Sequence, residues 1–167
     1  MIDNDETFLY YEDDLIDSPQ MIEKLLQIKS NNNYSTNISK PWQDNLIPDG
    51  VGKVKIWEVK DPSICSYLCY RIATVFPKVR TNNYNFSFLI YEWQEGSFIP
   101  WHNDAGHLCA LTCYLENKTE HGGEFLCKPF DDQTLGLCLD VKVNRVVFLK
   151  NVKHSVAKIH KGTRTSL

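Results

Sequence analysis

The stretch that decides the fold class is NFSFLIYEWQEGSFIPWHNDAGHLCALTCYLEN, residues 85–117. Its apolar and aromatic runs are short, and turn residues such as Glu95-Gly96 separate them, which is the pattern of successive β-strands. The same pattern continues to the last residue. The predicted strands cover 85–93, 96–102, 107–115, 122–130, 135–141, 144–150, 152–159 and 163–167. About eight strands without intervening helices predict an antiparallel sandwich, jelly roll or barrel.

The first half of the chain carries helix signals instead. Ser18 as N-cap and Pro19 as first helical residue predict a helix over QMIEKLLQIKS. The dipeptide Asp61-Pro62 opens a second helix, SICSYLCYRIATVF, which ends before a proline. We therefore expect one α+β, mainly β domain over residues 1–167, with its N-terminal helices packed outside the sheets.

Composition indicates an ordinary soluble globular protein, because 43% of the residues are apolar and 23% are charged. The acidic N-terminus lacks the features of a signal peptide, and no apolar run approaches the roughly 20 residues of a membrane helix. We therefore expect a cytoplasmic protein without a membrane partner. Its six cysteines are then expected to be reduced, and without a C-x-x-C pair a zinc site is not expected.

Charge is distributed unevenly along the chain. Residues 1–17 hold seven acids and no base, whereas the residues after Asp140 hold seven lysines or arginines and no acid. Such a basic segment either attracts an anionic partner or forms a solvated face.

His102 and Asp104, in the sequence PWHNDAG, stand two residues apart at the end of a predicted strand. Residues at this spacing share one face of a strand. They are either a hydrogen-bonded polar pair or two of three metal ligands. His154 is the candidate for a third ligand because it follows an apolar strand and can point inward. The other histidines, His107, His121 and His160, lie in predicted loops or turns.

Arg164 and Ser166 are predicted to share one face of the last strand, if Lys161-Gly162 turns a hairpin. An arginine that faces the interior is costly unless it meets a carboxylate. No acid follows Asp140, and the earlier acids are mostly in predicted loops or helices. Arg164 therefore indicates a carboxylate supplied by a ligand.

Two histidines and one carboxylate on one face of a metal form the facial triad of non-haem Fe(II) oxygenases. The order of His102, Asp104, His154, Arg164 and Ser166 resembles the 2-oxoglutarate/Fe(II)-dependent oxygenases. The segments CYLEN and GGEF resemble the prolyl-hydroxylase branch of that superfamily. The resemblance covers roughly residues 84–167, and residues 1–83 are expected to supply supporting strands and helices.

The resemblance implies a double-stranded β-helix, a jelly-roll or cupin-like fold. It implies Fe(II), 2-oxoglutarate and dioxygen as cofactor and cosubstrates, with ascorbate as a further possible one. The implied catalytic metal ligands are His102, Asp104 and His154. The residues implied to bind the cosubstrate are Arg164, Tyr114, Tyr91 and Ser166, where the two tyrosines are equally compatible with plain aromatic core. One departure is that many prolyl hydroxylases have lysine at the position of Arg164.

The resemblance further implies hydroxylation of a C–H bond, with a prolyl residue of a peptide or protein as the expected substrate. One alternative is a small-molecule oxygenase that acts on a free amino acid. Another is a non-catalytic β-helix module that binds metal or a partner. A nucleic-acid substrate is not expected. The branch of the superfamily that demethylates nucleic acids carries further arginines beyond the distal histidine, in a pattern that this sequence lacks.

Overall fold

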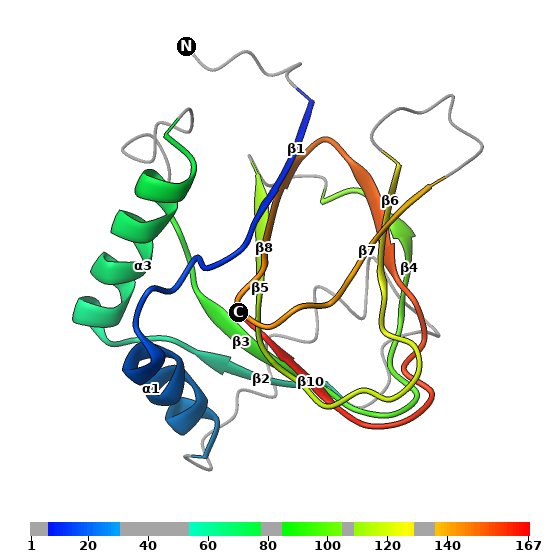
Figure 1. The fold of residues 1–167 in the computed structure, drawn as a ribbon, viewed down its shortest axis with the longest axis horizontal. Coiled ribbons are helices and arrows are strands. Elements are labelled where there is room, and N and C mark those ends of the chain that lie inside the picture. The colour runs from blue at the N-terminus through cyan, green and yellow to red at the C-terminus, as the bar shows by residue number, and fades with distance from the viewer. Residues whose placement is uncertain (1–6, 31–53, 78–84, 105–108, 129–135) are drawn as a thin grey trace.

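The computed structural model describes residues 7–30, 54–77, 85–104, 109–128 and 136–167. In these ranges ten strands form two antiparallel sheets (Figure 1). The larger sheet contains β1 (Phe8–Glu12), β2 (Val54–Glu58), β3 (Leu89–Trp93), β5 (Ala110–Asn117), β8 (Val146–Lys150) and β10 (Arg164–Ser166), in the order β1-β8-β5-β10-β3-β2. The smaller sheet contains β4 (Ile99–His102), β6 (Phe125–Lys128), β7 (Leu137–Leu139) and β9 (Lys153–Val156), in the order β4-β9-β6-β7.

The eight predicted strands are confirmed as β3 to β10, which make up four adjacent strands of the larger sheet and all of the smaller one. The chain crosses repeatedly between the sheets, which is the topology of a jelly roll, and the expected α+β, mainly β fold is confirmed. Most strand boundaries differ by a few residues: β3 begins at Leu89 and not at residue 85, and β5 ends at Asn117 and not at residue 115. Parts of three predicted segments (107–108, 129–130 and 135) lie outside the described residues.

Strands β1 and β2, which the sequence did not locate, extend the larger sheet at its two edges. β1 pairs with β8 and β2 pairs with β3, both antiparallel. Their partners stand far away in the sequence, so local patterns carry no signal for these pairings. The first half of the chain therefore supports the β-helix core with strands as well as helices.

Both predicted helices are confirmed, as α1 (Pro19–Ser30) and α3 (Pro62–Val75), and they lie together on one side of the larger sheet (Figure 1). α3 starts where Asp61 caps it, because the carboxylate accepts hydrogen bonds from the backbone N–H groups of Ser63 and Ile64 at 2.8 and 3.4 Å. At α1 the hydroxyl of Ser18 donates to the side chain of Gln20 at 3.0 Å and does not cap the helix.

Two hydrophobic cores follow from the period-two alternation of the strands. In β8, Val146 and Phe148 belong to the core between the sheet and the helices, with Leu25, Leu68 and Ile72 as helical members. The alternate residues Val147 and Leu149 belong to a second core, which lies between the two sheets. Several residues that project into this second core line a cavity inside the β-helix.

All six cysteines are free thiols in the structure, and they range from buried to exposed. Burial raises the pKa of Cys113 to about 12, so this thiol stays protonated and inert at neutral pH. No helix among the described residues is long and apolar enough to cross a membrane.

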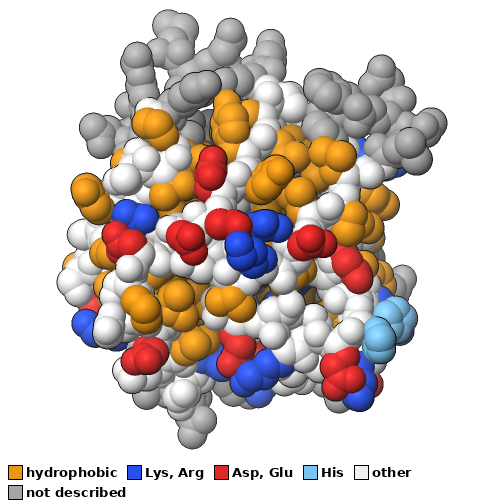
Figure 2. Space-filling view, viewed as in Figure 1, with side chains coloured by type: hydrophobic (Ala, Val, Ile, Leu, Met, Phe, Trp, Pro, Cys, Tyr) orange, Lys and Arg blue, Asp and Glu red, His pale blue; other side chains and the backbone are white. Residues whose placement is uncertain are grey.

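The basic residues after Asp140 are partly paired with acids from other parts of the chain. Lys142 and Arg145 bind Asp13 at 2.6 and 2.7 Å, and Lys161 binds Glu120 at 2.6 Å. Acidic and basic side chains are interspersed on the face shown in Figure 2. These pairings favour the solvated-face interpretation of the basic segment.

Asp13 ties the chain after β1 to the turn before β8, and we expect this contact to stabilise the fold in a pH-dependent way. Its hydrogen bonds to Arg145 and then Lys142 lower the pKa of the carboxyl from 3.8 to about 2. The stabilisation is therefore complete above about pH 4 and is lost as the pH falls towards 2. Because about a third of the Asp13 side chain is exposed, we expect Asp13→Asn to lower the free energy of unfolding by only about 1 kcal/mol at pH 7.

Urea unfolding of wild type and Asp13→Asn at pH 7 and near pH 2 tests this expectation. The matched control is Asp14→Asn, because Asp14 is exposed and its side chain makes no ion pair within the described residues. Its φ of 64° is a backbone conformation that asparagine also tolerates. If Asp13→Asn lowers the free energy of unfolding by as much near pH 2 as at pH 7, the stabilising role of the Asp13 carboxylate is contradicted.

Candidate metal centre

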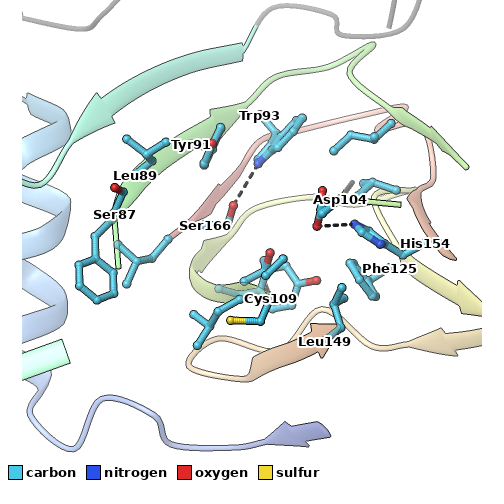
Figure 3. Close-up of a pocket in the computed structure, with 18 of the residues that line it drawn as sticks. Ser87, Leu89, Tyr91, Trp93, Asp104, Cys109, Phe125, Leu149, His154 and Ser166 are labelled. Carbon is cyan, nitrogen blue, oxygen red and sulfur yellow. Dashed lines mark hydrogen bonds and ion pairs between the residues drawn. The ribbon is translucent and has the colours of Figure 1, made fainter. Parts of the chain in front are cut away.

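His102, Asp104 and His154 meet inside the β-helix. His102 is the last residue of β4 and pairs with His154 on β9, so the two imidazoles start from neighbouring positions of the smaller sheet. Asp104 follows β4 by two residues and turns its carboxylate towards both rings, and Figure 3 shows the contact with His154. The structure thus places His154, the predicted third ligand, beside His102 and Asp104. His121 and His160 are exposed elsewhere, and His107 lies outside the described residues.

The geometry of the three side chains fits a metal ion. One ligand atom from each lies within 4.8 Å of the other two. Asp104 Oδ1 is 3.6 Å from His102 Nε2, and Asp104 Oδ2 is 3.5 Å from His154 Nε2. All three side chains are sheltered, with Asp104 the most exposed at 17%. Three ligands on one side leave the other side of an ion open to small molecules.

The backbone fixes the tautomer of both histidines. Nδ1 of His102 lies 2.8 Å from the carbonyl of Pro100, and Nδ1 of His154 lies 2.9 Å from the carbonyl of Val152. A carbonyl only accepts, so each Nδ1 carries the proton and a neutral ring has its lone pair on Nε2. Both Nε2 atoms face Asp104, and this is the arrangement in which outer hydrogen bonds orient metal-binding imidazoles.

The two histidines differ in their electrostatics. Burial lowers the pKa of His154, which keeps this ring in its neutral, metal-binding form at neutral pH. Burial also lowers the pKa of His102, but the hydrogen bonds to Asp104 and Pro100 outweigh it, so the net shift is upward. A cation between these rings and the carboxylate would take the place of the proton that Asp104 attracts.

Arg164 supplies a buried positive charge in the same cavity. The residue is 2% exposed. Its guanidinium donates from Nη1 to the carbonyl of Gly123, and its Cζ lies 5.6 and 5.3 Å from the ring centroids of Trp93 and Tyr114. It forms no ion pair with any carboxylate in the described part of the chain, and its Nε has no hydrogen-bond partner there. Burial lowers the pKa of Arg164 and outweighs the opposite effects of Tyr114 and Glu124. An anionic ligand would provide a compensating charge.

Two hydroxyl groups stand beside this guanidinium. The indole Nε1 of Trp93 donates to Ser166 Oγ at 3.1 Å, so the hydrogen of the Ser166 hydroxyl is available to another acceptor. The hydroxyl of Tyr114 is buried and finds no partner among the described residues, while burial raises its pKa to about 12. Both groups are therefore suited to donate to an anion that Arg164 holds.

Tyr91 is also brought to the site. Its ring stacks on Trp93 with centroids 5.7 Å apart, and burial, followed by the nearby Asp104, raises its pKa to about 12. A cavity of about 420 Å³ is lined by all seven predicted site residues: His102, Asp104, His154, Arg164, Tyr114, Tyr91 and Ser166. The structure thus joins in one cavity residues that the sequence could place only on separate strands.

Some contributors to the cavity were not predicted. Trp93 lies beneath Arg164 and donates a hydrogen bond to Ser166. Gly123 has a φ of 84°, and its carbonyl orients Arg164. The segment that leads into β3, with Ser87 and Leu89 in Figure 3, lines the far end of the cavity. Neither the carbonyl nor this segment has a sequence signature.

Known structures share this architecture. A viral collagen prolyl hydroxylase from Paramecium bursaria Chlorella virus 1, in complex with 2OG, matches with a TM-score of 0.66 at 14% identity, over 97% of this chain and 94% of that one. The chain has the fold of the prolyl hydroxylases. A Pseudomonas putida prolyl-4-hydroxylase matches with a TM-score of 0.66 at 12% identity, over 95% of this chain and 88% of that one.

A third similar structure is a Trichoplax adhaerens prolyl hydroxylase in complex with a peptide fragment of the hypoxia-inducible factor oxygen degradation domain. It matches with a TM-score of 0.64 at 14% identity, over 95% of this chain and 80% of that chain. No protein-family model and no curated protein matches the sequence. The resemblance stated from the motifs is thus confirmed for the fold, including the described parts of residues 1–83, which the motifs did not reach.

Proposed function

We propose that this protein is an Fe(II)- and 2-oxoglutarate-dependent dioxygenase that hydroxylates a prolyl residue of a peptide or protein. The observation that carries the proposal is the buried guanidinium of Arg164. It has no carboxylate partner in the described residues, yet it lines the same cavity as the two histidines and Asp104. A ligand with one carboxylate for Arg164 and a chelating end for a metal fits both halves of the cavity.

Each side chain then has a defined task. His102, Asp104 and His154 hold Fe(II) from one side, and the carbonyls behind the imidazoles keep their orientation. Arg164 binds the distal carboxylate of 2-oxoglutarate, with the hydroxyls of Ser166 and Tyr114 as further donors. The bound iron supplies the activation of dioxygen, coupled to conversion of the cosubstrate to succinate and carbon dioxide. The aromatic walls around Tyr91 keep water away from that chemistry.

The charge of the cavity supports a peptide over a free amino acid. Apart from the three candidate metal ligands and Arg164, the described residues that line it have uncharged side chains. A free amino acid would bring an ammonium and a carboxylate into surroundings that offer neither a partner, which is costly. A prolyl residue within a chain brings only amides and an apolar ring. The peptide complex of the Trichoplax structure is in keeping with this choice.

The experiment is succinate release from 2-oxoglutarate with Fe(II), ascorbate and oxygen, measured with different substrates. We expect proline-containing peptides to stimulate release several-fold and to gain the mass of one oxygen atom, while free proline and methylated oligonucleotides do neither. Stimulation by free proline alone would identify a small-molecule oxygenase. No release with any substrate, despite bound Fe(II), would identify a non-catalytic metal-binding module.

A further inference from the structure

Three polar side chains lie side by side on the helix-facing side of the larger sheet, directly behind the anion-binding residues. They are Glu116 on β5, Thr165 on β10 and Glu92 on β3, and the strand register places Thr165 opposite both glutamates. Because side chains alternate along a strand, Thr165 faces the helices while Arg164 and Ser166 face the cavity. A displacement of Thr165 therefore also displaces Arg164 and Ser166, its two neighbours in the strand.

Lys29, in the last turn of α1, contacts all three. Its Nζ lies 3.1 Å from Glu92 Oε2 and 3.2 Å from Glu116 Oε2, and it donates to Thr165 Oγ1 at 3.1 Å. The side chains of Lys29, Glu92 and Glu116 are only 20%, 17% and 23% exposed, so water screens these contacts weakly. One ammonium group thus links α1 to three neighbouring strands.

The position of this link matters because β10, although paired with β3 on one side and β5 on the other, is short. The strand has three residues, and its register with β5 shifts between Thr165 and Ser166. A slip of one residue in a strand turns every side chain to the opposite face. Here it would turn Arg164 out of the cavity.

We propose that Lys29 is a positioning residue for cosubstrate binding. It holds Thr165 between the two glutamates and thereby fixes the register of β10, so that Arg164 and Ser166 meet the carboxylate together. The inference rests on the proposed function, since the ligand concerned is 2-oxoglutarate. The proposal gives α1 a role in cosubstrate binding, although no residue of this helix lines the cavity.

The test is the KM for 2-oxoglutarate of Lys29→Met, with kcat and Fe(II) affinity measured in parallel. We expect KM to rise about three- to tenfold, because small displacements of a binding group are costly, while kcat at saturating cosubstrate and Fe(II) affinity stay within about twofold. The matched controls are Lys118→Met and Lys55→Met. Lys118 and Lys55 bind the same glutamates, at 2.7 and 3.4 Å, but from exposed positions and without touching Thr165. Both controls should keep the wild-type KM.

Thr165→Val provides an independent arm that keeps both ion pairs and the shape of the side chain. We expect it to raise the KM about threefold and to add nothing further when combined with Lys29→Met, because both changes remove the same link. A wild-type KM in Lys29→Met, an equal rise in the two controls, or additive effects in the double variant would overturn the inference. If Lys29→Met does not fold, an unchanged KM in Thr165→Val overturns it. If the wild type itself fails to bind 2-oxoglutarate, the proposed function fails and the positioning role falls with it, whereas a wild type that binds 2-oxoglutarate and a Lys29→Met variant with the same KM overturn the positioning role alone.

Discussion

His154→Ala is expected to abolish Fe(II) binding and all turnover, as are His102→Ala and Asp104→Ala. Replacing an outer-shell partner of a metal ligand already costs about 10- to 100-fold in affinity, so the loss of a ligand should exceed about 100-fold. The fold should survive, because the strands that carry the ligands are held by backbone pairing and by the core between the sheets. Fe(II) titration of the purified variants by equilibrium dialysis checks the expectation, with circular dichroism as the test of folding.

His160→Ala and His121→Ala are the matched controls, since both residues are exposed and away from the triad. Both should bind one Fe(II) per chain. Loss of binding in a control variant, with binding retained in His154→Ala, would show that the third ligand is wrongly assigned.

Arg164→Met is expected to weaken 2-oxoglutarate binding by more than about 100-fold, and Arg164→Lys by about 10- to 100-fold. A guanidinium holds a carboxylate with two parallel hydrogen bonds, whereas an ammonium acts as a point charge. Fe(II) affinity should not change. Stability should be equal or higher in Arg164→Met, because the variant replaces a buried cation that has no carboxylate partner among the described residues with an apolar chain of similar length.

Isothermal titration of the Fe(II)-loaded protein with 2-oxoglutarate, without oxygen, measures these affinities. Lys161→Met is the control, since Lys161 binds Glu120 on the surface and should not affect the cosubstrate. If Arg164→Met unfolds while the protein that remains folded still binds 2-oxoglutarate, Arg164 is structural.

The strands and the triad were predictable because both depend on local patterns. Alternating apolar residues defined the eight core strands, and the two-residue spacing placed His102 and Asp104 on one face. His154 could be selected because it follows an apolar strand, and Arg164 because a predicted hairpin turns it inward with no acid nearby in the sequence. Their meeting in one cavity depends on the β4–β9 and β10–β3 registers, which pair residues far apart in the sequence.

The other contacts of the site join residues far apart in the sequence, so no local sequence pattern predicts them. The carbonyl of Gly123, the Trp93–Ser166 hydrogen bond and the contacts of Lys29 each join residues at least forty positions apart. The tyrosines were predicted either to bind the cosubstrate or to be aromatic core. In the structure Tyr114 is a core residue and also lines the cavity. Sequence patterns identify which side chains are unusual, but only the register shows what they contact.

The most direct test of the central claim is the visible absorption of the protein with Fe(II) and 2-oxoglutarate in the absence of oxygen. We predict a charge-transfer band that requires both components, saturates at one Fe(II) per chain, is absent in His154→Ala, and needs far more 2-oxoglutarate in Arg164→Met. A folded wild-type protein that binds Fe(II) but shows neither the band nor any effect of 2-oxoglutarate would contradict it.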